Sequence, residues 1–167
     1  MMINFKELFS AGASFNAFAT TGLAGEIKAV EEARTKLASL PESLKEEVRA
    51  VQGNYYLLTA AELWCPDCQR NVTAMQFLSE LQPTIQQAII SKSRAERSLM
   101  AALQLEKIPV PFTAILNADF ELLGTFVERP QAVINGDDEV LQRYRQGELL
   151  GETVKDILAV IQQSAAA

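Results

Sequence analysis

The sequence predicts an α/β domain built on a central mixed sheet, with a helical extension in front of it. From residue 55 to residue 102, patterns typical of strand, helix, strand and helix follow one another, which implies a parallel strand pair joined by a right-handed crossover. Two further strand-like runs separated by a short turn predict an antiparallel hairpin. At 167 residues and 49% hydrophobic composition, the chain has enough apolar side chains for one globular unit with a real core.

The chain before Gly53 is expected to be helical. Two apolar stripes at helical spacing predict this: Phe5, Leu8 and Phe9, and then Ile27, Val30, Ala33 and Leu37. Ser39 followed by Glu42 matches a capping box at the start of a further helix. The inward-facing residues of that helix are expected to be Leu44, Val48 and Val51. We therefore predict a helical extension over residues 1–52, which is either a partner surface or lid or a packed extension of the core.

A buried strand and a helix are predicted on either side of the two cysteines. The run Tyr55–Ala61 is short and almost continuously apolar, as in a parallel strand that is covered on both faces. Apolar residues then recur at helical spacing as far as Leu81, and Pro83 follows the expected end of this helix. The inward-facing positions are Val72, Met75, Leu78 and Leu81. The cysteines therefore lie between a strand and a helix.

The same reasoning predicts the rest of the α/β domain, which we assign to residues 53–167. In chain order the elements are a weak strand at 84–90, a helix with inward-facing Ala95, Leu99 and Ala102, hairpin strands at 112–116 and 122–127 around a turn at 117–119, and helices near 140–144 and 154–161.

The charge and the missing histidine exclude several classes of function. A net charge of −6 gives no general attraction to nucleic acid or to an anionic membrane, because both bind basic surfaces. We therefore expect neither as a partner. The chain has no histidine, which removes the commonest metal ligand and the general base of Ser-His-Asp and Cys-His hydrolases.

Residues 8–25 carry no charge, but they are not predicted to be a signal peptide or a membrane span. Polar residues and glycines interrupt the segment too often for either. We therefore expect a cytoplasmic protein. Reducing conditions there argue against a purely structural disulfide and leave catalysis or metal binding for a cysteine pair with two intervening residues.

Cys65 and Cys68 are the only cysteines, and their spacing suits a reversible disulfide. At the first turn of a helix, unpaired backbone N–H groups and the helix dipole favour a thiolate, which is the species that attacks a disulfide. Two alternatives remain open. A zinc site needs about four ligands, so this pair could bind metal only by bridging two chains. The fold could also be a non-catalytic interaction module. We expect no resident metal and no cofactor.

Three segments together resemble the thioredoxin superfamily, over roughly residues 53–163. Leu57–Cys68, which ends in Trp-Cys-Pro-Asp-Cys, looks like the first core strand with its active-site turn. Ile108–Phe112 looks like the loop whose cis-proline faces the cysteines. Leu123–Pro130 is similar to the end of the last strand in a bacterial thioredoxin-like subfamily that also has a helical N-terminal extension.

The resemblance implies a three-layer α/β/α fold and a thiol–disulfide oxidoreductase. In that family the first cysteine, here Cys65, attacks a substrate disulfide, and the second, here Cys68, resolves the mixed disulfide. The implied partners are a disulfide-containing protein substrate and a thiol or reductase that donates electrons. The further site residues that it implies, mainly for substrate binding, are Trp64, Pro66, Asp67, Val110, Pro111 and Arg129.

Two prolines compete for the cis position. Placing the cis bond at Val110-Pro111 leaves an uninterrupted strand after it, whereas a cis bond at Pro109 would put Pro111 inside a central strand, where it would delete a ladder hydrogen bond. We therefore assign Pro111. Trp64 beside the nucleophile is expected to be a hydrophobic contact surface, or else a large residue half-buried at a strand end.

The chain departs from thioredoxin at two positions. Thr59 replaces a buried aspartate, so Glu62 is the candidate acid near Cys68, or else a solvated surface group. Asp67 replaces a proline, and its negative charge is expected to oppose a thiolate. Arg129 is expected either to stabilise the thiolate or hold a substrate carboxylate, or else to pair with Glu128 or cap a helix.

Overall fold

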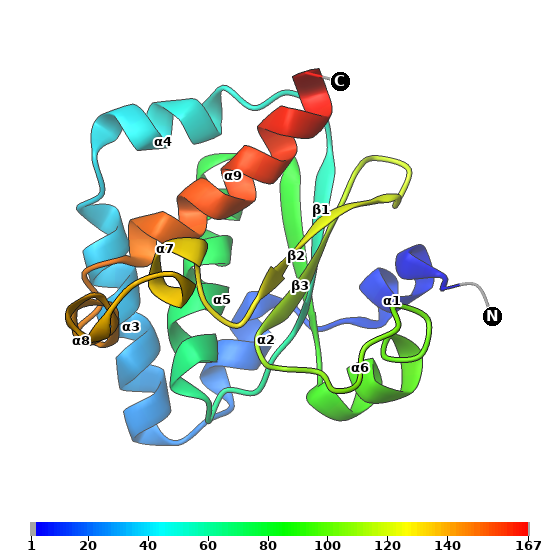
Figure 1. Cartoon of the computed structure of the whole chain (residues 1–167), viewed down its shortest axis with the longest axis horizontal. Coiled ribbons are helices and arrows are strands. Elements are labelled where there is room, and N and C mark those ends of the chain that lie inside the picture. The colour runs from blue at the N-terminus through cyan, green and yellow to red at the C-terminus, as the bar shows by residue number, and fades with distance from the viewer. Residues whose placement is uncertain (1–2, 167) are drawn as a thin grey trace.

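A mixed sheet with strand order β2-β1-β3-β4 forms the centre of the molecule (Figure 1). The structure is a computed structural model that describes residues 3–166. Within this range the strands are β1 (Tyr55–Ala60), β2 (Ile85–Ile90), β3 (Phe112–Leu116) and β4 (Leu122–Val127). β1 and β2 run parallel, whereas β3 pairs antiparallel with both β1 and β4. The predicted mixed sheet, with its parallel pair and its hairpin, is confirmed.

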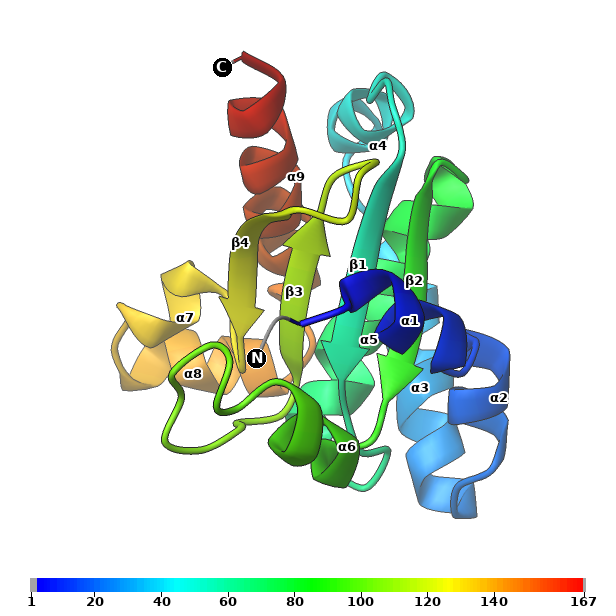
Figure 2. The same ribbon diagram turned by 90° about the vertical axis from the view of Figure 1, so that its right-hand side faces the viewer.

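Helices cover both faces of the sheet (Figure 2). In the described range they are α1 (Phe5–Ala11), α2 (Phe15–Thr20), α3 (Ala24–Ala38), α4 (Glu42–Arg49), α5 (Pro66–Leu81), α6 (Lys92–Ser98), α7 (Gln131–Ile134), α8 (Asp138–Arg145) and α9 (Leu150–Ala166). One face packs on α5 and α9, and α3 lies against α5. The other face carries α1 and α6. Leu57 and Leu58 of β1 enter opposite layers because successive strand side chains alternate, which gives the predicted three-layer fold.

The segment between α1 and α2 lies against the edge strand β2. Ala13 forms an isolated antiparallel bridge with Ile89, with backbone N···O distances of 2.8 and 2.9 Å. A Cβ atom on Gly12 would lie 2.9 Å from the Cβ of Ala88, so this close approach requires glycine. The bridge covers part of an exposed strand edge.

The helices before β1 share the core of the sheet. Ala33 and Leu37 of α3 belong to the same buried cluster as residues of α5 and α9, and Leu44 and Val48 of α4 join it. These four residues of the predicted helical stripes therefore face the core, whereas Ile27 is only half-buried. The division of the chain into two units at residue 53 stays a prediction.

The start of α4 differs from the prediction. Ser39 and Glu42 do not form a capping box there, because Ser39 ends α3 and Pro41 is the residue before the first turn of α4. Proline already has a φ suited to a helix start, and no side chain caps this end by hydrogen bonding. Val51 lies beyond the helix but still packs against the core.

Two other helices also differ. α6 ends before Leu99, which remains buried, and the chain then turns through Gln104, whose φ is 56°, so Ala102 is not helical. The single-turn helix α7 was not predicted from the sequence; it follows Pro130 directly. No helix within residues 3–166 is both long enough and apolar enough to cross a membrane.

Candidate active site

The two cysteines lie at the start of α5, directly after the loop that leaves β1. Cys65 is the N-cap residue and Pro66 occupies the first helical position, where its missing N–H costs no hydrogen bond. Both cysteines are free thiols. Cys65 keeps 9% of its surface exposed, whereas Cys68 is fully buried one helical turn along. Only the first cysteine therefore reaches the surface.

The two thiols have very different pKa values because their surroundings differ. The pKa of Cys65 is lowered to about 6, chiefly because the Cys68 thiol donates a hydrogen bond to its sulfur. Burial of Cys65 raises the pKa. The backbone N–H groups of Cys68 and Asp67 lower it further. The same hydrogen bond and then burial raise the pKa of Cys68. The charge of Asp67 does oppose the Cys65 thiolate, as expected, but it is the smallest of these causes. One cysteine is thus ionised at neutral pH while the other holds its proton.

The loop before β3 faces Cys65. The Sγ atom of Cys65 lies 3.7 Å from the carbonyl oxygen of Val110, and the Val110-Pro111 peptide bond is cis. Pro111 is buried directly before the first residue of β3, whereas Val110 is partly exposed. The structure therefore brings Val110, the residue before the cis-proline, to Cys65.

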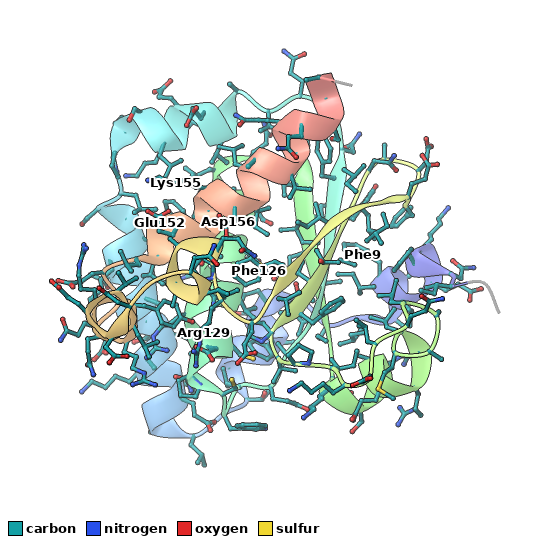
Figure 3. All side chains as sticks on the ribbon, in the orientation of Figure 1. Phe9, Phe126, Arg129, Glu152, Lys155 and Asp156 are labelled. Atoms are coloured by element: carbon teal, nitrogen blue, oxygen red, sulfur yellow. The ribbon has the colours of Figure 1, made fainter. Side chains whose placement is uncertain are left out.

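Asp67, between the cysteines, is held by an unforeseen set of partners. Tyr144 of α8 donates a 2.6 Å hydrogen bond to its Oδ1 atom. Nε of Arg129, which lies just past the end of β4 (Figure 3), is 3.3 Å from both carboxylate oxygens, and Arg70 Nη1 is 3.6 Å from Oδ1. Arg129 therefore pairs with Asp67, a partner that differs from each one expected from the sequence.

The buried side-chain amide of Asn71 holds the partners of Asp67 in place. The side-chain NH₂ of Asn71 donates to the Tyr144 hydroxyl at 2.8 Å and to the Glu128 carbonyl at 3.1 Å, and the Thr153 hydroxyl donates to Asn71 Oδ1 at 2.6 Å. Asn71 and Thr153 are fully buried. The sequence offered one overlooked signal, since Tyr144 is a lone aromatic residue in a helix of mostly polar residues.

Thr59, which stands where thioredoxins carry a buried aspartate, belongs to a cluster of polar side chains. The Thr59 hydroxyl lies 3.1 Å from that of Thr113 and 3.0 Å from Oε1 of Gln87. The Glu62 carboxylate accepts the backbone N–H of Lys92 at 3.3 Å, while the Glu62 N–H lies 3.5 Å from Cys68 Sγ. The role of Glu62 as an acid stays a prediction.

The N-terminal helices form one wall of the site, which the sequence did not reveal. Phe15 and Ala19 of α2 belong to the same buried cluster as Cys65 and Cys68. Gly22, in the turn after α2, is so close to Leu63 that an added Cβ would lie 2.3 Å from its Cδ2 atom. Exposed apolar side chains flank this contact on both segments: Leu23 at 73% and Trp64 at 63%.

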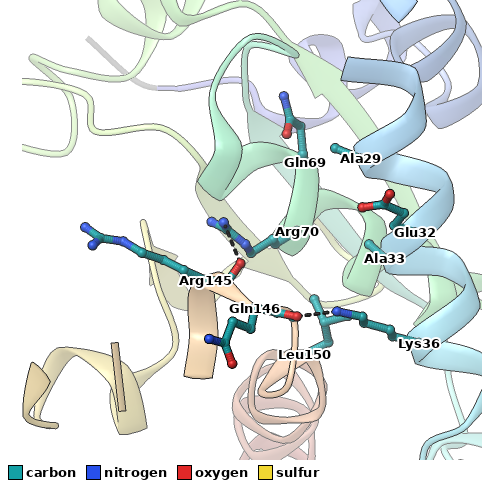
Figure 4. A pocket seen from close by; sticks show the side chains of 10 residues that line it. Ala29, Glu32, Ala33, Lys36, Gln69, Arg70, Arg145, Gln146 and Leu150 are labelled. Atoms are coloured by element: carbon teal, nitrogen blue, oxygen red, sulfur yellow. Dashed lines mark hydrogen bonds between the residues drawn. The ribbon is translucent and has the colours of Figure 1, made fainter. Parts of the chain in front are cut away.

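A pocket between α3, α5 and the loop before α9 contains neither cysteine (Figure 4). Two of its three cationic side chains have partners, because Arg70 donates to the Arg145 carbonyl at 3.1 Å and Lys36 donates to the Gln146 carbonyl. The Arg70 guanidinium also lies 5.0 Å from the centre of the Tyr144 ring. These contacts hold the Arg70 side chain in place beside α8. Among residues 3–166, no group of three Cys, Asp or Glu side chains is arranged to hold a metal ion.

Comparisons with known proteins agree with this fold. A family model described as thioredoxin matches residues 12–148. The crystal structure of a protein of unknown function from Pseudomonas aeruginosa is similar over 98% of this chain and 99% of its own, with 46% identity and a TM-score of 0.94. The crystal structure of an HIV epitope-scaffold protein is similar over 96% and 98%, with 45% identity and a TM-score of 0.93. No curated protein matches. The chain belongs to the thioredoxin family.

Proposed function

We propose that the protein is a thiol–disulfide oxidoreductase that reduces disulfides in other proteins. The observation that supports this best is the contrast between the two cysteines: Cys65 is partly accessible with a pKa of about 6, and Cys68 is buried with a raised pKa. A thiolate at the surface and a protonated thiol behind it are what a two-step exchange requires.

In the first step the Cys65 thiolate attacks one sulfur of a substrate disulfide, and the other substrate sulfur leaves as a thiolate. A mixed disulfide now joins Cys65 to the substrate. In the second step Cys68 loses its proton and attacks the Cys65 sulfur, which releases the second substrate thiolate. The substrate gains two electrons and, on protonation, two protons; the protein is left with a Cys65–Cys68 disulfide. A thiol or a reductase supplies the electrons that restore the dithiol.

The surface around Cys65 supports a polypeptide substrate. Trp64 presents a large exposed ring next to the nucleophile, which suits contact with an apolar segment. The Val110 carbonyl lies beside Cys65 Sγ, where a backbone N–H of an extended substrate segment would find an acceptor. Pro66 fixes the turn between the sulfurs. We place this activity in the cytoplasm, where thiols are kept reduced.

Two single substitutions test the mechanism. Cys65→Ser should abolish turnover of a protein disulfide, whereas Cys68→Ser should trap the mixed disulfide with the substrate. An equilibrium redox titration of the unaltered protein, followed by Trp64 fluorescence and by mass, should show the reversible loss of two hydrogens. Full activity in both serine variants would overturn the proposal. The open alternatives predict other results: a dimer that a chelator dissociates for metal bridging, or a partner complex that survives loss of both cysteines for an interaction module.

A further inference from the structure

The carboxylate of Asp67 lies between the two cysteines in sequence and carries a charge that opposes the Cys65 thiolate. Its side chain is only 13% exposed, so water screens this charge poorly. An unpaired carboxylate this close to the nucleophile would raise the pKa of Cys65. The structure instead surrounds it with groups that bind negative charge.

The charged and titratable groups that contact the Asp67 carboxylate come from separate parts of the fold. They are Arg70 on α5, Arg129 after β4 and Tyr144 on α8. Two cations face this one anion, and the Glu128 carboxylate also acts on Arg129. Burial, and then the bond to Asp67, raise the pKa of Tyr144, so its phenol stays a hydrogen-bond donor.

These partners are themselves fixed in place. Asn71 donates both to the Tyr144 hydroxyl and to the carbonyl of Glu128, the residue before Arg129. Glu128 has a φ of 69°, a conformation that few non-glycine residues adopt. The same Nδ2 atom also lies 2.8 Å from the backbone carbonyl oxygen of Asp67. A single buried amide thus connects the cysteine turn, α8 and the chain that carries Arg129.

We propose that Arg129 and Tyr144 are positioning residues for Cys65: they hold the Asp67 carboxylate in one place and neutralise it, so that a thiolate forms at Cys65 despite the acid in the motif. This inference rests on the proposed function for its biological meaning. It differs from a direct role for Arg129, because the guanidinium acts here through Asp67 and not on the sulfur.

A double-mutant cycle on the Cys65 pKa separates these two roles. The pKa is read from the ultraviolet absorbance of the thiolate in the reduced full-length protein. We expect Arg129→Gln to raise it by roughly 0.5 to 1 and Asp67→Asn to lower it. In the Asp67→Asn background, Arg129→Gln should change it little, since no carboxylate remains to be held. Arg129→Lys, which keeps the charge, should restore most of the loss.

Tyr144→Phe removes one hydroxyl and leaves the ring in place, so it tests the inference even if Arg129→Gln folds poorly. It should raise the Cys65 pKa with a smaller amplitude and move the reduction potential to more negative values. Arg143→Gln is the matched control: this arginine of α8 pairs with Glu148 at 3.5 Å, away from Asp67.

An equal effect of Arg129→Gln in both backgrounds would show direct action on the sulfur and overturn the inference. Unchanged pKa values in Arg129→Gln and Tyr144→Phe would overturn it too. The thiolate titration needs no disulfide substrate, so the result is independent of turnover. A pKa that responds as expected in a protein that never forms a reversible disulfide would overturn the proposed function alone.

Discussion

The sulfur of Cys65 lies 3.7 Å from the carbonyl oxygen of Val110, although the two residues are 45 positions apart. The contact joins the start of α5 to the loop that enters β3. Cys68 lies behind this contact, fully buried and donating its thiol hydrogen to Cys65. Several measurable properties follow from this arrangement.

Cys65 should titrate with a midpoint near pH 6 and react with an alkylating reagent at neutral pH, while Cys68 stays unmodified in the folded protein. Cys68→Ala should raise the Cys65 pKa, because it removes the hydrogen bond that lowers it most. Alkylation rates measured against pH, with the modified residue identified by mass, check both statements. An ordinary midpoint near 9 in the unaltered protein would contradict them.

The stability of the reduced protein should rise between pH 6 and pH 9 relative to Cys65→Ala. The folded pKa of Cys65 is about 6 and its ordinary value is 9, so the folded state binds fewer protons in this interval. The contribution is present above the ordinary pKa and is lost as the pH falls through the folded pKa. Partial exposure reduces it to roughly 1 to 2 kcal/mol. Urea unfolding under reducing conditions at several pH values measures it, and parallel curves for the two proteins would contradict it.

Trp64→Ala should weaken the use of protein disulfides far more than that of a small disulfide. The exposed ring offers contact area only to a partner large enough to cover it. KM should rise by roughly tenfold for a protein substrate, which corresponds to about 1.4 kcal/mol of lost contact. Leu122→Ala is the control, because Leu122 is also exposed and apolar but starts β4 in the hairpin. Equal KM values for Trp64→Ala and the unaltered protein would argue against a contact surface.

Two glycines that differ in their surroundings test the packing of the N-terminal segment on β2. Gly12→Ala should cost about 1 to 3 kcal/mol, because its Cβ would lie 2.9 Å from Ala88 Cβ and 3.2 Å from the backbone nitrogen of Ile89. Gly25→Ala has no heavy atom within 4 Å and lies in α3, so it should leave the free energy of unfolding unchanged or raise it by up to about 1 kcal/mol. Urea unfolding compares the two, and equal effects would contradict the close approach.

The sequence by itself determined the parts of the protein that depend on neighbouring residues. The apolar run of β1, the helical spacing of α5 and the turn between β3 and β4 reflect local preferences and periodic burial, so they were predicted close to their observed bounds. The Cys65–Cys68 pair was recognisable for the same reason, since both cysteines belong to one helical turn. Local signals were misleading at Ser39, where a nearby proline supplied a competing helix start.

Only the tertiary structure decided which distant groups surround the cysteines. Asp67 meets Arg129 and Tyr144 across 62 and 77 positions, and Asn71 meets Thr153 across 82. The wall formed by α2 has the same origin, because the bridge from Ala13 to β2 brings that helix to the site. The charge of Asp67 could be read from the sequence, but its neutralisation could not. Side-chain pairing at this range depends on how strands and helices pack, and no local pattern encodes it.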